Sequence, residues 1–141
     1  MGCGFPRAVC AALVAVVTAV GPAAGQVPGF DTSRVYSESA FEQAIRPYTE
    51  ALARNASDAR AHYWLGVAYL HAFRLYRWGL APYAAGYGVR AVQSLERAAE
   101  LDPQPVVLLA LLEAYAAVGD RARYHALIGR LGQLATPLPV R

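Results

Sequence analysis

The sequence predicts an all-α fold of about five helices with no sheet. Twenty-nine alanines and sixteen leucines stand against two isoleucines, a balance that favours helices over strands. Five stretches repeat apolar residues with the spacing of one helix face, and glycine, proline or capping residues separate them. No stretch alternates apolar and polar residues as a strand does, so every element is expected to be a helix.

The first 25 residues have the order of an export signal. Arg7 precedes thirteen mostly apolar residues at 8–20, and Gly21-Pro22 and three small residues follow. Thirteen residues are short for a bilayer span. We expect a signal peptide over 1–25, cleaved near Gly25, and an exported protein, periplasmic or extracytoplasmic. The alternative is an uncleaved N-terminal anchor. Both cysteines, Cys3 and Cys10, lie in this segment.

The next residues predict a flexible lead-in and two helices. Residues 26–38 carry proline, glycine and serine without a helical period. Ser39 and Glu42 have capping-box spacing, which predicts a first helix from about 40 to 54 that Pro47 either kinks or begins. A second helix is expected from 59 to about 80, ended by Gly79 and Pro82.

Three more helices complete the predicted domain, which covers residues 39–135. The third follows a loop rich in glycine and tyrosine at 81–88 and ends at Asp102-Pro103. The fourth spans about 105–118 and ends at Gly119, and Asp120 caps the fifth, which reaches Leu134. Residues 136–141 form a tail.

Small and large residues recur at matching positions with a period of roughly 34 residues. One pattern pairs a leucine and a glycine with a tyrosine, and the other spaces small residues around a large one. The residues are Leu65, Gly66, Tyr69, Leu111, Leu112 and Tyr115 for the first pattern, and Ala44, Tyr48, Ala51, Ala91, Leu95, Ala98 and Pro103 for the second. The chain therefore resembles the tetratricopeptide repeat family. This resemblance implies antiparallel helix pairs stacked as a short solenoid, in which small residues allow close approach.

Four departures from the family pattern stand out. Tyr69 and Ala91 are 22 residues apart where the family has about nine, so an insertion is expected at about 72–88. Tyr124 stands where the last repeat should have a small residue, and Leu112 replaces a glycine. The first repeat lacks its first helix, because residues 26–38 cannot supply one.

The resemblance also implies a concave groove, lined by the first helix of each repeat, that binds peptides. The register places there Arg60, Tyr63, Val67 and Leu70 from the central repeat and Val106, Leu109 and Glu113 from the next. This set is mostly apolar, so an apolar or aromatic peptide segment is the expected ligand. The alternative is that Tyr63, Val67 and Leu70 are buried by a neighbouring helix.

The insertion gathers aromatic residues and arginines, which are common anchors of interfaces. They are Phe73, Arg74, Tyr76, Arg77, Trp78, Tyr83 and Tyr87. The segment is expected either to dock a partner, to stack on a glycan or meet a membrane surface, or to extend the preceding helix with Phe73 and Tyr76 packed against the third helix.

The sequence offers no catalytic, cofactor or metal pattern. His62, His71 and His125 are far apart and have no ligand-spaced companions. Without the signal segment the chain carries twelve arginines, no lysine and ten acids, an excess too small to predict nucleic-acid binding. The arginine and alanine usage is typical of a GC-rich bacterial genome.

The predicted function is a non-catalytic adaptor or scaffold that binds a protein or peptide in the bacterial cell envelope. The alternative is an exported module that binds a glycan or lipid through the insertion. Because both ends of the array are incomplete, a homodimer is a further hypothesis.

Overall fold

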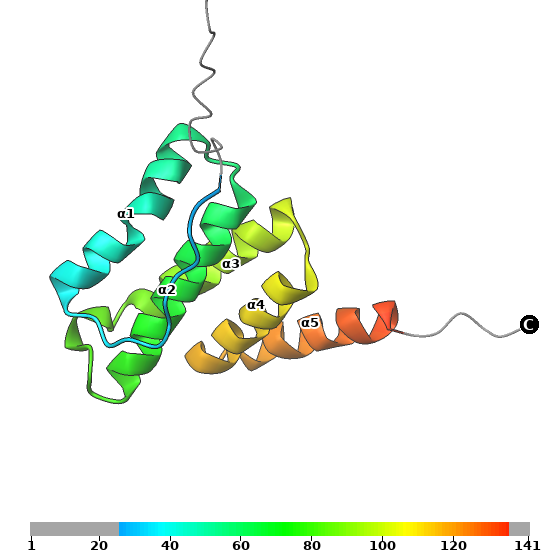
Figure 1. The fold of residues 1–141 in the computed structure, drawn as a ribbon. Coiled ribbons are helices and arrows are strands. Elements are labelled where there is room, and N and C mark those ends of the chain that lie inside the picture. The colour runs from blue at the N-terminus through cyan, green and yellow to red at the C-terminus, as the bar shows by residue number, and fades with distance from the viewer. Residues whose placement is uncertain (1–25, 136–141) are drawn as a thin grey trace, which may run out of the picture.

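The computed structural model describes residues 26–135, which form five α-helices (Figure 1). The helices are α1 (Glu38–Arg54), α2 (Ala59–Arg77), α3 (Tyr87–Leu101), α4 (Pro105–Val118) and α5 (Arg121–Leu134), with a 3₁₀ turn at Pro82–Ala84. No strand occurs in the described residues, and the predicted all-α stack of helix pairs is confirmed. The expected signal peptide and the tail lie outside this range.

Helices α2 and α3 form the most extensively packed pair. A Cβ atom added at Gly66 would lie 2.5 Å from Cγ of Leu95, so only glycine fits this crossing without movement. Ala91 and Ala98 of α3 are fully buried. The small residues of the repeat pattern therefore stand where the helices approach most closely, which is the physical reason for that pattern.

An aromatic cluster fills the space between α1, α2 and the start of α3. Phe41 is fully buried, and its ring centroid lies 5.3 Å from that of Tyr87 and 6.0 Å from that of Tyr83. The Tyr83 hydroxyl donates a hydrogen bond to the Tyr36 carbonyl oxygen at 2.9 Å. The cluster therefore ties the loop before α3 to the segment before α1.

The lead-in, which the sequence predicted to be flexible, is packed against α2 over residues 27–36. Val27, Phe30 and Tyr36 are buried, and the segment runs beside α2 in Figure 1. Arg60 Nε donates to the Val27 carbonyl oxygen at 3.3 Å. Because no helix precedes α1, the face of α2 next to α1 would be exposed to solvent. The irregular lead-in covers this face.

Two helix boundaries differ from the sequence predictions. Helix α1 is capped by Ser37, whose hydroxyl accepts from the Ala40 amide, so the predicted capping box at Ser39 does not form. Pro47 lies inside α1; the carbonyl that it leaves unpaired belongs to the exposed Gln43, which water can satisfy. Helix α2 ends at Arg77 because Gly79 adopts a left-handed φ of 77°.

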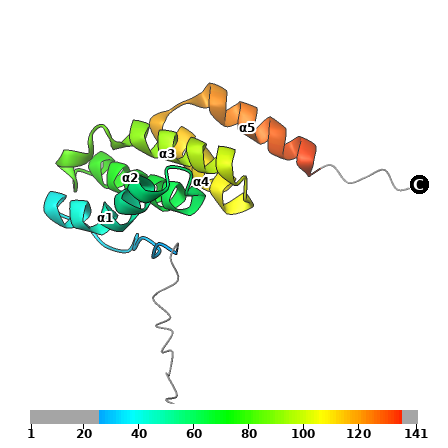
Figure 2. The ribbon, with the colours of Figure 1, turned by 90° about the horizontal axis from the view of Figure 1, so that it is seen from above.

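Helix α5 stands away from the rest of the stack, as the view from above shows (Figure 2). Its only buried residue in the described chain is Leu127. Tyr124 and Leu112 are half-buried in the core shared by α3, α4 and α5. No helix in residues 26–135 is long and apolar enough to cross a membrane.

Candidate functional site

A groove of about 580 Å³ lies between α2 and α4. Most of its lining comes from two helices that the repeat register places side by side, with one residue from the lead-in. The lining residues are Thr32, Tyr63, Val67, Leu70, His71, Arg74, Trp78, Val106, Leu109, Ala110 and Glu113. We call this surface the α2–α4 groove.

The walls of the α2–α4 groove expose large apolar side chains. Val106 and Leu109 of α4 are 55% and 58% exposed, and Trp78 at the end of α2 is 70% exposed. Leu70 is buried beneath them. Apolar side chains that gather in a hollow, in place of being scattered singly, are typical of a binding surface.

One end of the groove is charged. Arg74 Nη1 lies 3.4 Å from Glu113 Oε2, and both side chains are more than half exposed. An exposed ion pair contributes only about 0–1 kcal/mol, so a ligand can displace it at little cost. A second hollow of about 430 Å³ continues past this pair and shares Arg74, Trp78 and Glu113 with the groove.

Hydrogen bonds hold the polar side chains of the groove wall. His71 Nε2 lies 2.7 Å from the Arg34 carbonyl oxygen and donates to it, because a carbonyl only accepts. Burial, and secondarily the charge of Glu113, raises the pKa of Tyr63. The Tyr63 phenol therefore stays protonated at neutral pH and presents a hydrogen-bond donor in an apolar wall.

The structure brings together all but one of the groove residues that the sequence predicted. Tyr63, Val67, Leu70, Val106, Leu109 and Glu113 line the groove. Arg60 does not, because the lead-in lies over its part of α2 and takes its hydrogen bond. Sequence reasoning did not place Thr32, His71 and Ala110 here. For Thr32, the apolar residues of the lead-in, Val27 and Phe30, were a signal that this segment packs against the helices.

The insertion residues do not form one surface. Arg74, Arg77 and Trp78 are exposed at the end of α2, beside the groove. Tyr83 and Tyr87 are half-buried and pack in the aromatic cluster, away from the other three. Phe73 packs toward α3, where a Cβ atom at Gly88 would lie 3.0 Å from its ring, and Tyr76 stacks on Phe73. The extended-helix interpretation therefore describes much of the segment.

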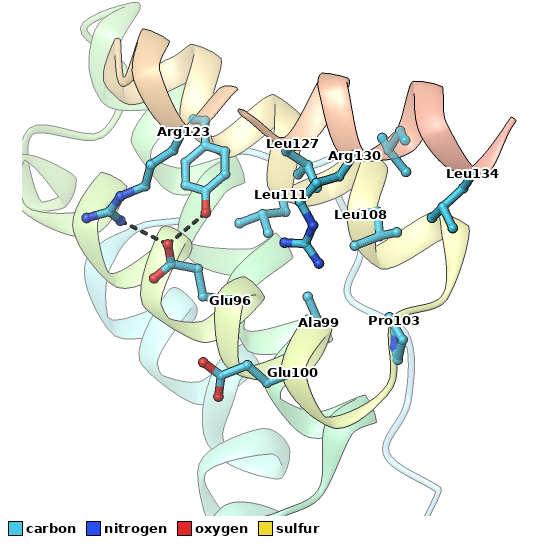
Figure 3. A pocket seen from close by; sticks show the side chains of 12 residues that line it. Glu96, Ala99, Glu100, Pro103, Leu108, Leu111, Arg123, Leu127, Arg130 and Leu134 are labelled. Atoms are coloured by element: carbon cyan, nitrogen blue, oxygen red, sulfur yellow. Dashed lines mark hydrogen bonds and ion pairs between the residues drawn. The ribbon is translucent and has the colours of Figure 1, made fainter. Parts of the chain in front are cut away.

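A second cleft, which the sequence did not predict, lies between α3, α4 and α5 and has a volume of about 710 Å³ (Figure 3). Its apolar lining includes Leu108, Leu111, Leu127, Leu131 and Leu134, and its charged lining is Glu96, Glu100, Arg123 and Arg130. We call it the α3–α5 cleft.

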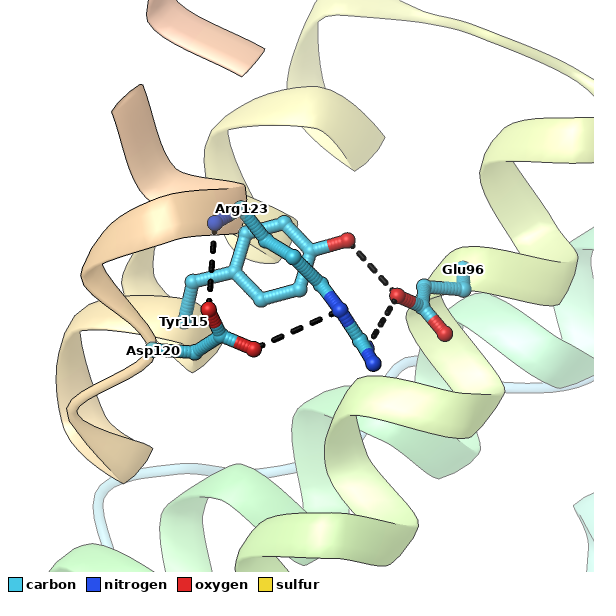
Figure 4. Close-up of polar contacts among 4 residues, drawn as sticks. All are labelled: Glu96, Tyr115, Asp120 and Arg123. Atoms are coloured by element: carbon cyan, nitrogen blue, oxygen red, sulfur yellow. Dashed lines mark hydrogen bonds and ion pairs between the residues drawn. The ribbon is translucent and has the colours of Figure 1, made fainter. Parts of the chain in front are cut away.

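Glu96 of α3 is the polar centre of this region (Figure 4). Its Oε1 accepts from the Tyr115 hydroxyl at 2.7 Å and from Arg123 Nη1 at 2.9 Å. Arg123 Nε also lies 3.3 Å from Asp120 Oδ2. Burial and the hydrogen bond to Glu96 raise the pKa of Tyr115 to about 12. This network joins α3, α4 and α5 and pairs the charge of Arg123 with the carboxylates of Glu96 and Asp120.

The described residues contain no group of three His, Cys, Asp or Glu side chains that could hold a metal ion. Compared with known families, residues 34–71, which comprise α1 and most of α2, match the model described as TPR repeat. No curated protein and no solved structure matches the chain. Tetratricopeptide repeats are typically non-catalytic and generally mediate protein–protein interactions.

Proposed function

Because residues 34–71 match the TPR repeat model, we propose that this protein is a non-catalytic adaptor or scaffold that binds a partner protein through the α2–α4 groove. The ligand is a peptide segment with apolar or aromatic side chains. The observation that carries the proposal is the exposure of Val106, Leu109 and Trp78 around one hollow.

The groove suits a peptide with apolar anchors and few charges. Burying one leucine-sized side chain against Val67, Leu70 and Leu109 contributes about 1.5–3 kcal/mol. Arg74 and Glu113 lie at the edge and can each pair with an opposite charge of the ligand, because their own ion pair is exposed.

The lead-in shows how α2 contacts a chain segment that has no regular secondary structure. Its buried Val27 and Phe30 supply apolar contacts, while Arg60 and His71 of α2 donate hydrogen bonds to its carbonyl oxygens. The neighbouring α2–α4 groove has the same kinds of group: apolar walls, a phenol donor at Tyr63 and one arginine, Arg74, with Arg77 in the adjoining hollow.

Selection of peptides from a random library on the purified protein tests the proposal. Binding of a selected peptide, measured by fluorescence anisotropy, is expected to weaken at least about tenfold in Leu109→Asp, since a carboxylate in an apolar contact must be desolvated. Val89→Asp is the matched control. Val89 is 62% exposed on α3 and lies outside the groove lining, so affinity should change less than about twofold. Equal binding by the parent and Leu109→Asp would refute the proposed site.

We also propose that the protein works outside the cytoplasm of a bacterium, after removal of residues 1–25. The support is the order of basic, apolar and small residues in that segment. N-terminal sequencing of the protein from the cell envelope should begin at Gln26. Recovery of the chain only with Met1 or Gly2 at its start would contradict cleavage.

A further inference from the structure

The apolar stripe of α5 is only partly covered by the rest of the molecule. The stripe consists of Tyr124, Leu127, Ile128, Leu131 and Leu134. Leu127 is 6% exposed, but Ile128 is 44% exposed and Leu134 80% exposed. Leu131 and Leu134 border the α3–α5 cleft, whose floor is Leu108 and Leu111 of α4. This face is therefore apolar, hollowed and open to solvent.

The cause of the cleft is visible in the repeat register. In the α2–α3 pair, Gly66 and the fully buried Ala91 allow the helices to touch. The corresponding positions of the α4–α5 pair hold Leu112 and Tyr124, and both side chains occupy space in the shared core. We attribute the outward position of α5 to these two larger side chains. The cleft therefore follows from the residues that this sequence has at the two positions.

The cleft has one available charge on each wall. On the α5 wall, Arg130 extends into the cleft (Figure 3) and has no hydrogen bond or ion pair in residues 26–135. On the α3 wall, Glu100 is 65% exposed and only its Oε2 contacts a cation, Arg97 at 2.9 Å. The two remaining charges, Glu96 and Arg123, neutralise each other.

We propose that the α3–α5 cleft is the interface of a symmetric dimer, in which each copy's α5 packs into the cleft of the other. A two-fold interface brings the same patch from both copies together, so it must be complementary to itself. This patch meets that condition, because an arginine wall and a glutamate wall flank a common apolar floor. Two-fold pairing places Arg130 of one copy against Glu100 of the other, twice, while Leu134 and Leu131 of each copy enter the other's apolar floor.

The dimer leaves the α2–α4 groove free. Helix α4 turns Val106, Leu109 and Glu113 toward that groove and Leu108 and Leu111 toward the cleft. The two surfaces therefore use different faces of α4, and a dimer presents two peptide grooves. The inference does not depend on the proposed peptide binding, and either can fail alone.

Sedimentation equilibrium of the purified protein from about 1 μM to about 1 mM tests the proposal. A mass of two chains is expected at the upper end, with the dimer weakened by added salt because Arg130 and Glu100 contribute. A single-chain mass at every concentration would overturn the proposal. The same result is expected if the cleft instead holds a helix of another protein.

Charge exchange then tests the geometry with variants that need not unfold the chain. Arg130→Glu and Glu100→Arg are each expected to weaken dimerisation at least about tenfold, since like charges then face each other, and the double variant should recover most of the loss. Arg121→Glu, a reversal on α5 outside the cleft lining, is the control and should have little effect. Circular dichroism checks that each variant is helical. Failure of the double variant to recover would overturn the assigned pairing.

Discussion

Replacing Gly66 with alanine is expected to lower the free energy of unfolding by about 1–2 kcal/mol. Two effects oppose each other. Alanine in a helix interior is better than glycine by about 0.5–1 kcal/mol. Against this, the new methyl group would lie 2.5 Å from Leu95 Cγ, 2.9 Å from its Cδ2 and 3.2 Å from its backbone nitrogen.

The clash should win because Leu95 has nowhere to move. Its side chain is fully buried, and the third contact is with the backbone of α3, so relief requires the helices to separate. Inserting a methyl group into a well-packed core costs about 1–3 kcal/mol, and the short contacts here place Gly66→Ala toward the upper part of that range. The helix preference then offsets part of the cost.

Urea denaturation followed by circular dichroism measures the change, and α5 provides the matched control. Gly129 is also inside a helix, and an added Cβ atom there would meet nothing within 4 Å. Gly129→Ala should therefore raise the free energy of unfolding by about 0.5–1 kcal/mol. If Gly66→Ala were as stable as Gly129→Ala, the argument that glycine is required by the α2–α3 crossing would be wrong.

Two further predictions concern the lead-in and the network around Glu96. Phe30→Ala should loosen the lead-in, because it removes a ring buried beside Tyr36 and His71. Trypsin should then cleave the variant after Arg34 faster than the parent, as measured by mass spectrometry. An unchanged cleavage rate would argue against packing of the lead-in. Tyr115→Phe should lower the free energy of unfolding by about 1–2 kcal/mol near pH 7, since it removes a hydrogen bond to a carboxylate. Because the folded-state pKa of Tyr115 is raised to about 12 from the ordinary 10.0, its contribution is complete below pH 10 and is lost as the pH rises to about 12. The difference between parent and variant, measured by urea denaturation at several pH values, should therefore shrink over that interval, and a constant difference would contradict the pKa.

Local chemistry in the sequence was sufficient for the helices and their order. Helix α4 was predicted at its observed bounds, because proline is favoured in the first turn of a helix, where Pro105 stands, and Gly119 readily adopts the left-handed φ of 78° that ends one. Asp120 caps α5 as expected, and Asp58 caps α2. The predicted groove lining followed from the repeat register, because residues three and four apart share a helix face.

Where several local signals compete, the sequence was a weaker guide. Ser37 and Ser39 both carry side chains that can cap a helix, and in the structure Ser37 is the residue that caps α1. In the same way, the sequence predicted Tyr83 and Tyr87 as interface residues, whereas in the structure both rings pack beside Phe41.

The sequence by itself determined the five helices, because caps, breakers and apolar periodicity act over a few residues. It also indicated the repeat register and the small residues at the α2–α3 crossing, because these recur at matching positions of the repeat. The tertiary structure decided the burial of Val27 and Phe30, the exclusion of Arg60 from the groove and the opening of the α3–α5 cleft. Each of these depends on which surface is left uncovered when the helices pack, and that is a property of contacts between residues distant in the chain.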